Sequence, residues 1–432
     1  MMELKKVALA LVGKARSEGS AGAEAWVRRR KSTRCTSEGG EVSGSVRLDA
    51  SIRVRLSDGR QGQRAGRISG LEGASTLLSA ALASAQSTPV STVDAFHLDI
   101  ATMGLGILDR RQAFLTDEDR LDVVRVNHRA MSTAGIEVCP VAVVYTEELQ
   151  EVSFASTGGI EADYRSSRFS LTAEAHIREN SSRRVQRTLS CRSFADACSR
   201  PLGAGVGRDV MAMCSQAELP EEPCTLVFSQ GVMGQLLPKL LPAFEHSRLE
   251  SGKSFLSRRL GSPQGSSVVH ITDDATTPGG LQTRAFDGRG VPPVAVPLWV
   301  EGVPTGRYLG VEHAVAAGLR PSGHEGLDGQ LWPGNVVVRP GSRSRNMLFP
   351  DLGELVLCTE LLGSRIDLRT GSLSLKLRCF THDSDGGGYI GDLDMKTNVT
   401  ALFASVLHLA SDQERHGFVD TPTWILRGPW FQ

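Results

Sequence analysis

The chain has 432 residues, more than one ordinary hydrophobic core organises, so we expect two domains. Its hydrophobic content of 40% and charged content of 22% are typical of a soluble globular protein. Lysine plus arginine and aspartate plus glutamate both number 48, so no overall field attracts nucleic acid or an anionic membrane. Direct nucleic-acid binding is therefore not expected.

The cysteines and the N-terminal residues favour a cytoplasmic protein with reduced thiols. The eight cysteines include no C-x-x-C pair, and most lie beside apolar residues, which is typical of buried free thiols. Residues 1–10 mix acidic and basic side chains with short apolar runs, unlike a signal peptide. No run approaches the ~20 apolar residues that a membrane span needs, so no membrane association is expected.

The first half of the chain alternates between helical and strand periodicity. Thr116, followed by three acidic residues, marks the start of one amphipathic helix. A Ser-Asp-Gly-Arg turn at residues 57–60 joins two strands. The predicted helices cover residues 4–16, 77–85 and 121–134, and the predicted strands cover residues 23–30, 51–56, 138–145, 151–156 and 169–177. Residues 94–110 show no clear pattern and receive no assignment.

Residues 193–216 are helix-like but contain a run of glycines, Gly203, Gly205 and Gly207. Such a run cradles phosphate when a strand feeds the loop, whereas the residues before this run predict a helix. A nucleotide loop is therefore not expected. The proline-rich, charged residues 219–223 predict the boundary between an N-terminal domain of residues 1–218 and a C-terminal domain of residues 219–432.

The second half is predicted to be mainly β. Apolar residues recur at helical spacing from Val232 to Phe244, which predicts a helix that is kinked at Pro238 or starts there. A second helix is predicted over residues 398–408. Short strand candidates separated by glycines cover residues 294–300, 336–339, 354–361, 366–368 and 373–378. The glycine-rich residues 383–388 predict a hairpin tip rather than a calcium loop.

Four short motifs follow one another along this half of the chain. They read K-S-F-L-S-R-R-L-G from Lys253, D-D from Asp273, F-D-G-R-G-V from Phe286, and N-V-V-V-R-P-G from Asn335. In order and spacing they resemble the TldD/PmbA family of zinc-peptidase-related proteins, and the resemblance covers essentially the whole chain. It implies an α+β fold: an N-terminal domain with an antiparallel sheet and flanking helices, then a mainly antiparallel β domain carrying a degenerate metal helix.

The chain departs from the family's catalytic branch where that branch binds zinc. The catalytic branch carries His-Glu-x-x-x-His on the apolar helix, and the corresponding positions here are Pro242, Ala243 and Ser247. None of these is a zinc ligand. The branch's third ligand is a cysteine, and residues 412–420 contain none. The resemblance is therefore to the PmbA (TldE) branch, and no metal or other cofactor is expected in this chain.

Other positions in the motifs also bear on the site. Arg289 and Ser372 stand where the family has a glutamate and an aspartate, so no role for those carboxylates is carried over. Glu245, His246 and Glu250 could replace the missing ligands, but a hydrated helix end is the preferred interpretation. The candidate cleft and motif residues are Glu245, His246, Lys253, Ser254, Asp287, Gly290 and Asn335.

Two other groups of residues are of types that can carry chemistry. Asp273 and Asp274 could act as acid and base, because carboxylates in a cleft shift their pKa values. The resemblance places this pair at a strand-to-loop junction, so a solvated turn is the preferred interpretation. The histidines His270, His313 and His324 are scattered along the sequence and individually carry little information.

The resemblance implies a partner role. PmbA-type chains pair with a TldD-type zinc chain, and the two enclose a cavity where unfolded peptide is cut. We therefore expect a non-catalytic subunit of such a metallopeptidase complex, with a peptide as substrate and zinc in the TldD-type partner. Two alternatives stay open. One is a stand-alone homodimer that acts on a small peptide or amide in specialised metabolism, and the other is a non-enzymatic adaptor that binds another protein.

The aromatic ending of the chain also has two interpretations. Residues 424–431 contain three aromatic side chains in a chain that is only 5% aromatic. They could contribute to a subunit interface, because obligate interfaces resemble a hydrophobic core. Alternatively, they form a terminal strand of the β domain, with Trp424 and Leu426 facing its core.

Overall fold

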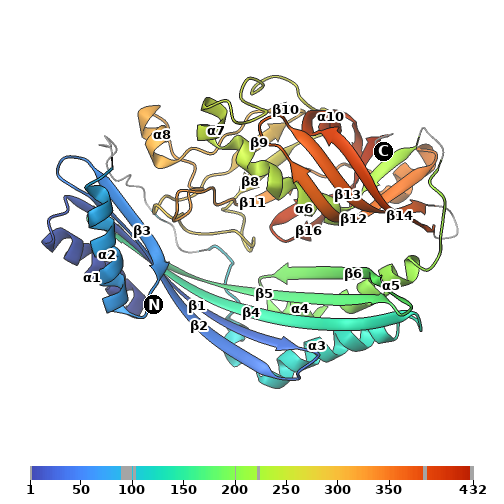
Figure 1. The fold of residues 1–432 in the computed structure, drawn as a ribbon, viewed down its shortest axis with the longest axis horizontal. Coiled ribbons are helices and arrows are strands. Elements are labelled where there is room, and N and C mark those ends of the chain that lie inside the picture. Colours follow the sequence, from blue (N-terminus) through green and yellow to red (C-terminus); the bar gives the residue numbers. More distant parts are fainter. Residues whose placement is uncertain are drawn as a thin grey trace.

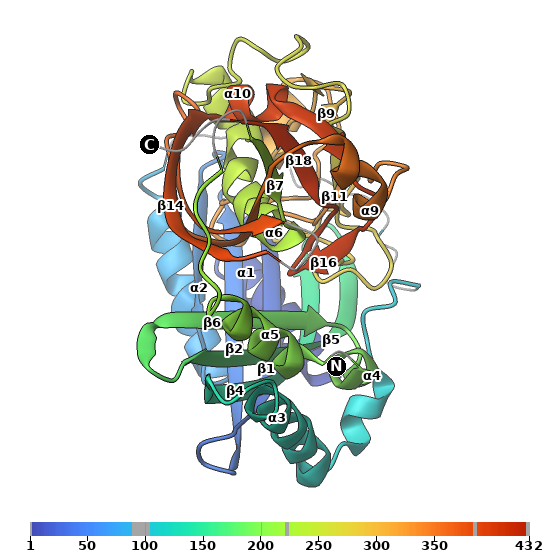
Figure 2. The ribbon, with the colours of Figure 1, turned by 90° about the vertical axis from the view of Figure 1, so that its right-hand side faces the viewer.

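The computed structural model describes residues 2–88, 100, 104–199, 201–220, 224–382 and 387–428. A long, twisted sheet built from the N-terminal half runs along the lower side of the view in Figure 1, and the C-terminal strands lie above it. Seen from the side in Figure 2, α3 lies below this sheet and the C-terminal sheets lie above it. The mixed α+β architecture and the β-rich C-terminal region agree with the sequence-based prediction.

In the described N-terminal residues, six antiparallel strands form one sheet in the order β3-β2-β1-β4-β5-β6. They are β1 (Gly22–Thr36), β2 (Val42–Arg55), β3 (Gln61–Arg67), β4 (Val138–Ser156), β5 (Glu161–Ile177) and β6 (Asn180–Cys191). The predicted strands 138–145 and 151–156 are one strand, because the polar residues between them pair with β1 and β5. β6 was not predicted, since most of its side chains are polar and exposed.

Helices cover one face of this sheet. They are α1 (Met2–Ser17), α2 (Leu71–Ala85), α3 (Asp117–Ser132), α4 (Phe194–Ser199) and α5 (Leu202–Ala212), with the 3-10 turn η1 (Arg110–Phe114) before α3. Val27 packs in the cluster with α1 and α2, and Cys35 packs in the cluster with α3 and α5. Both residues are odd-numbered positions of β1, and side chains alternate along a strand, so the two helix groups share one face.

The predicted helices are confirmed, and α3 starts as expected. The Asp119 amide donates to Thr116 Oγ1 at 3.2 Å, and the Thr116 amide donates to Asp119 Oδ2 at 2.8 Å. This capping box satisfies two of the orphan donors at the helix end. The glycine run lies within α5, where a Cβ on Gly203 would overlap the Asn127 carbonyl of α3. The glycines therefore allow close helix packing, and no phosphate loop forms.

Two mainly antiparallel sheets make up the C-terminal region. Their strand orders are β10-β9-β8-β11-β17-β16 and β14-β13-β12-β7-β18-β15, with parallel pairing between β11 and β17 and between β7 and β12. The strands are β7 (Thr225–Phe228), β8 (Ile271–Asp274), β9 (Val296–Val300), β10 (Val303–Pro304), β11 (Asn335–Val338), β12 (Leu355–Ile366), β13 (Ser372–His382), β14 (Tyr389–Asn398), β15 (Val406–Leu409), β16 (Glu414–His416), β17 (Val419–Thr421) and β18 (Trp424–Arg427).

One hydrophobic core lies between these two sheets and contains the buried side of α6. The helical segments of this region are short. They are α6 (Gln230–Leu240), η2 (Leu241–Phe244), α7 (His246–Glu250), α8 (Val311–Ala316), α9 (Arg345–Leu348), η3 (Phe349–Asp351) and α10 (Val399–Ala404). The sequence left open whether this helix is kinked at Pro238 or starts there. Pro238 lies inside α6, so the helix does not start at this residue.

Strand pairing and burial decide the outcome of several C-terminal predictions. The helix expected over residues 398–408 ends at Ala404, because Val406 and the residues after it pair with β18 as a strand. The predicted strand 354–361 lies in β12, which continues to Ile366. The predicted strand 366–368 shares only Ile366 with β12, because residues 367–370 form the turn to β13. Trp424 and Leu426 are fully buried in β18, which confirms the terminal-strand interpretation for that part of the ending. The predicted domain boundary, the predicted hairpin tip and the aromatic ending of the chain include residues 221–223, 383–386 and 429–432, respectively. These residues lie outside the described part of the chain.

Two further features concern the cysteines and the apolar character of the helices. All eight cysteines are free thiols, and most are buried, as their apolar neighbours predicted. In the part of the chain that the structure describes, no helix is long and apolar enough to cross a membrane.

The two halves of the chain meet through a turn at Phe286. The Phe286 ring is fully buried and packs on the face of the sheet opposite the helices, 5.7 Å from the Phe154 ring and 5.2 Å from the Tyr164 ring. Gly290 completes the turn at a φ of 73°, and a Cβ there would overlap the Phe154 ring. Gly290 therefore serves both an unusual backbone conformation and a close contact between the two halves.

We predict that Gly290→Ala destabilises the protein by about 3 kcal/mol, because it adds overpacking against Phe154 to the strain of a positive φ. Gly261→Ala is the matched control: its φ is 77°, but a Cβ there meets nothing within 4 Å, so a loss of about 1 kcal/mol is expected. Equilibrium urea unfolding of both variants measures the difference. Equal losses would show that the contact with Phe154 tolerates the methyl group.

Candidate functional site

The apolar helix of the C-terminal region is broken where the family's metal motif would lie. α6 ends at Leu240, η2 follows, and Glu245 has extended backbone before α7 begins. Pro242 lies in the first turn of η2, and proline has no N–H to continue an α-helical ladder. Ala243 is completely buried in the hydrophobic core, whereas Ser247 is exposed on α7. The three positions therefore face different surroundings.

A pocket of about 310 Å³ lies beside this break, between the two halves of the chain. Arg53 of β2 contributes from the N-terminal sheet, and the other lining residues come from the C-terminal region. They are Glu245, His246, Ser247, Tyr308, Leu309, Gly310, Glu312, His313, Ser322, His324, Glu325, Gly329, Gln330 and Leu331. Imidazole and carboxylate groups dominate the polar lining, so the pocket can both donate and accept hydrogen bonds.

Glu245 and His246 form the wall next to the broken helix. Both are half-buried, so the expected hydrated helix end is only partly hydrated. Burial raises the pKa of the Glu245 carboxyl, and Arg248, 3.5 Å away, opposes that rise. Burial and then the neighbouring His313 lower the pKa of His246, whose ring centroid lies 5.0 Å from that of His313. These effects favour uncharged groups along this wall.

Behind the pocket, Asp273 forms a buried network with Tyr308 and His324. Asp273 is fully buried, so the interpretation of this residue as part of a solvated turn is wrong. Its Oδ2 accepts from the Tyr308 hydroxyl at 2.6 Å, and its Oδ1 lies 3.5 Å from His324 Nε2. Burial opposes ionisation, but the contacts with His324 and Tyr308 outweigh it and lower the pKa of Asp273. Asp274, partly exposed, accepts from the Thr276 amide.

The tautomer of His324 follows from its other neighbour. His324 Nδ1 lies 2.8 Å from the Ser322 carbonyl oxygen, which can only accept, so Nδ1 carries a proton. Nε2 then faces Oδ1 of the Asp273 carboxylate. This pairing could not be predicted from the sequence, because Asp273, Tyr308 and His324 are far apart along the chain and meet only through the fold.

Arg289 takes part in a charge cluster at the rim of the pocket. It is nearly buried, and its guanidinium lies 3.4 Å from Glu24 of β1 and 3.4 Å from Glu325. Arg53 lies 3.7 Å from the same Glu325 carboxylate. Where the family pattern has a glutamate, this chain therefore uses a cation to join the N-terminal sheet to the pocket loop. Truncating either partner would leave a charge in a partly buried site.

Asp287 organises the turn that carries Phe286. Its Oδ1 accepts from the Arg289 and Val291 amides at 2.8 and 3.0 Å, and its Oδ2 accepts from the Glu325 amide at 3.0 Å. The side chain is almost completely buried. This burial raises the pKa of Asp287 to about 7, although the three amide donors oppose the rise.

The other predicted candidates lie away from the pocket. Ser254 is buried and donates to the Ala243 carbonyl at 2.7 Å, which fixes the broken helix. Asn335 accepts from the Gln282 amide and donates to the Asp274 carbonyl, so it pins the loop after β8. Lys253 is exposed. Of the seven candidates, Glu245 and His246 line the pocket, while Ser254, Asp287, Gly290 and Asn335 hold the surrounding loops in place.

The pocket does not offer a set of zinc ligands. Among the described residues, no group of three or more histidine, cysteine, aspartate or glutamate side chains is placed to hold a metal ion. A zinc site needs three or four such ligands close together. Pro242, Ala243 and Ser247 supply none of them, so the residues do not fit the metal of the catalytic branch.

Comparison with known families supports the resemblance seen in the motifs. Residues 221–429 match the family model described as the PmbA/TldA metallopeptidase C-terminal domain. No curated protein matches the chain in sequence at a significant level.

Solved structures share the fold over the whole length of the chain. A Thermotoga maritima protein described as a candidate modulator of DNA gyrase is 18% identical, with a TM-score of 0.85 and coverage of 99% of both chains. A Bacteroides thetaiotaomicron protein of the same description is 18% identical, with a TM-score of 0.87 and coverage of 99% of this chain and 98% of that one. TldE from Thermococcus kodakarensis is 17% identical, with a TM-score of 0.83 and coverage of 98% and 99%.

We predict that Asp287 makes stability depend on pH between about 4 and 7. A carboxyl whose folded pKa is raised contributes stability that is complete below its unfolded pKa and is lost as pH rises through its folded pKa. The wild type should therefore lose an amount on the order of a few kcal/mol across this interval through this group.

Asp287→Asn should flatten that dependence, as measured by urea unfolding at a series of pH values. Asp328→Asn is the matched control, because Asp328 also accepts the amide of the residue two positions later but is exposed. That control should keep the wild-type slope. A pH profile of Asp287→Asn that parallels the wild type would contradict the assignment.

Proposed function

We propose that this chain is a member of the TldD/PmbA family without a zinc site of its own, a subunit that assembles with a zinc-bearing TldD-type chain to process peptides. The match of residues 221–429 to the PmbA/TldA family model supports the family assignment. The proposal rests on the residues found at the positions of the metal motif. Pro242 breaks the helix, and Ala243, at the position of the catalytic branch's glutamate, is sealed in the hydrophobic core.

The chemistry of peptide hydrolysis explains why these positions matter. A metallopeptidase activates water on its metal and needs a carboxylate beside it to take the proton. The side chain at position 243 carries no carboxylate and, being fully buried, has no access to substrate. In the proposed complex, hydrolysis belongs to the partner, and this chain contributes walls of the peptide cavity.

The pocket beside the broken helix supports a role in handling peptides. Its lining includes the half-buried Glu245 and His246, together with Glu312 and His313. Mixed donors and acceptors of this kind suit the N–H and C=O groups of a peptide. The likeness in fold to TldE from Thermococcus kodakarensis favours the same interpretation. A second copy of this chain is the other assembly to be tested.

We predict that the purified chain retains no tightly bound zinc. Metal analysis after exhaustive dialysis should find zinc well below one ion per chain, because the degenerate positions Pro242, Ala243 and Ser247 provide no ligand. About one zinc per chain that survives dialysis would show a metal site elsewhere in the chain and would overturn the proposal.

We also predict that the chain alone leaves an unstructured substrate such as casein intact, whereas the chain mixed with a TldD-type protein supports cleavage that a chelator abolishes. The TldD-type protein alone is the control and should cleave less. Sedimentation of the mixture should show a heteromeric complex. Chelator-insensitive cleavage by the isolated chain would reveal another nucleophile, and a homodimer that ignores the TldD-type protein would favour the stand-alone alternative.

A further inference from the structure

The face of the N-terminal sheet that lies toward the C-terminal sheets in Figures 1 and 2 is rich in arginine. Because side chains alternate along a strand, the even-numbered residues of β1 share this face with Trp26, which packs in the same hydrophobic cluster as Phe286. The residues that pair with them on neighbouring strands point to the same side. Six arginines lie there around the carboxylates Asp49 of β2 and Glu148 of β4. We call them the arginine face: Arg28, Arg30 and Arg34 of β1, Arg47 of β2, Arg67 of β3 and Arg168 of β5.

The two carboxylates do not balance these cations. Asp49 accepts from Arg28 Nη2 at 2.8 Å and from Arg47 Nε at 2.6 Å. Glu148 lies 3.7 Å from Arg30. Six guanidinium groups less two carboxylates leave an excess of four positive charges. Three of the arginines make no ion pair among the described residues: Arg34, Arg67 and Arg168.

Arg30 and Arg47 are held side by side by the pairing of their strands. They are direct cross-strand partners of β1 and β2, and like charges in such positions are destabilising. Arg30 is also half-buried, and this burial, followed by the charge of Arg28, holds the pKa of Arg30 below its usual value. The fold alone is therefore better served by an uncharged side chain at this position. Conflicts of this kind are typical of binding sites, where a ligand supplies the missing opposite charge.

We propose that the arginine face binds an extended, acidic peptide segment whose carboxylates lie on every second residue. In an extended chain such side chains share one side and repeat at roughly 6.8 Å, which is also the spacing of Arg28 and Arg30 along β1. The planar guanidinium group suits this partner, because it binds a carboxylate through two parallel hydrogen bonds. Arg53 of the pocket beside the broken helix lies on the same side of the sheet, since it pairs with Glu24 of β1. The inference rests on the proposed function, in which this chain lines a peptide cavity, and it names acidic segments as the preferred ones.

A nucleic acid fits this face less well. Proteins that bind single strands combine cations with exposed aromatic rings on which the bases stack. On the described part of this face, the aromatic rings of the strands are those of Trp26, Phe154 and Tyr164. All three are buried in the cluster with Phe286, so they cannot stack with a base.

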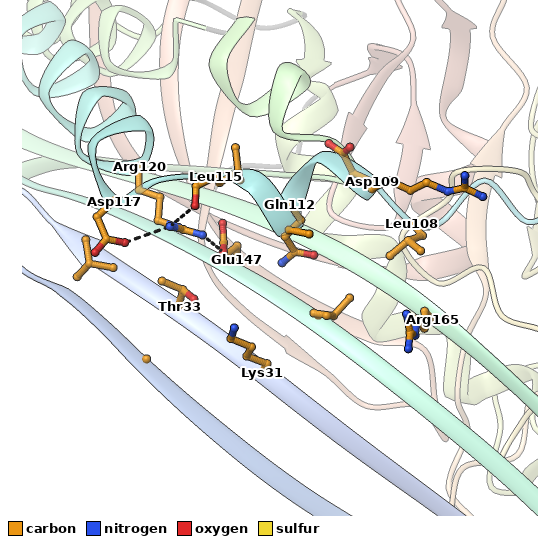
Figure 3. A pocket seen from close by; sticks show the side chains of 15 residues that line it. Lys31, Thr33, Leu108, Asp109, Gln112, Leu115, Asp117, Arg120, Glu147 and Arg165 are labelled. Carbon is orange, nitrogen blue, oxygen red and sulfur yellow. Dashed lines mark hydrogen bonds and ion pairs between the residues drawn. The ribbon is translucent and has the colours of Figure 1, made fainter. Parts of the chain in front are cut away.

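The opposite face of the sheet treats its arginines differently. A cavity of about 720 Å³ lies on that side, and Figure 3 shows the charged side chains in its lining. Arg120 donates there to Asp117 at 3.1 Å and to Glu147 at 2.7 Å, and Arg165 lies 2.9 Å from Glu151. These two arginines have carboxylate partners, whereas half of the cations on the arginine face have none among the described residues.

Fluorescence anisotropy of the full chain tests the proposal with two labelled peptides of equal composition. In one peptide glutamate alternates with threonine, and in the other all the glutamates precede the threonines. The alternating peptide should bind saturably and about fivefold more tightly, and its binding should weaken at higher salt, because salt screens exposed charges. Equal affinity for the two peptides would overturn the proposal. Tighter binding of a thymidine oligonucleotide with the same number of charges would do so too, since it shows a preference for nucleic acid.

This measurement uses the chain without a TldD-type protein, so it is independent of the cleavage assay that tests the proposed function. Cleavage with the TldD-type protein, combined with no binding of the alternating peptide, would overturn this inference and leave the proposed function intact. Binding of the alternating peptide by a chain that supports no cleavage would support the acidic site and overturn the proposed function.

Matched variants locate the binding. Arg47→Glu should weaken it about tenfold. Lys31→Glu, the same charge reversal at an exposed position on the opposite face, should leave binding unchanged. Arg30→Gln should weaken binding about fivefold and leave the urea unfolding midpoint unchanged or higher, because it removes a repulsion from the folded state. Equal losses in Arg47→Glu and Lys31→Glu, or a lower unfolding midpoint in Arg30→Gln, would overturn the proposal.

Discussion

The contact that the rest of this structure depends on is the turn at Phe286, where an aromatic ring and a carboxylate are buried together. Phe286 packs against Phe154 and Tyr164 of the N-terminal sheet, which removes a large apolar side chain from water. Asp287, next in sequence, is desolvated by the same packing and is stabilised by three backbone amides. The packing that joins the two halves thus also imposes the unusual pKa of Asp287.

The pocket beside the broken helix exists because this turn fixes the loops around it. Arg284, two residues before Phe286, is buried and donates to the carbonyls of Gly323 and Trp332, which ties the loop of His324 to the turn. Glu325 then meets Arg289, so the charge cluster closes the gap between the two halves. If these carbonyl groups moved, the buried guanidinium of Arg284 would lose its hydrogen-bond partners. The turn at Phe286 and the loop of His324 therefore hold each other in place.

The sequence predicted the parts of the fold that rest on local signals. Helical stripes, the helix start at Thr116 and the Asp58-Gly59 turn each depend on residues close together in the chain, and each was found. β6 and the middle of β4 were missed, because their polar residues are held by pairing with neighbouring strands rather than by their own periodicity. The site was predicted less well, since Asp273, Tyr308 and His324 form a network only through distant contacts.

The residues at the break between α6 and α7 suit the fold for a physical reason. A charged or metal-ligating side chain at position 243 would need compensation in a hydrophobic core, whereas alanine needs none. Pro242 ends the helix, but Ser254 bonds to the Ala243 carbonyl and satisfies an acceptor that the break would otherwise leave unpaired. Val232, Leu236 and Leu240 of α6 still bury their apolar side chains against both sheets. Packing and hydrogen bonds among the chain's own residues therefore hold the scaffold around the break.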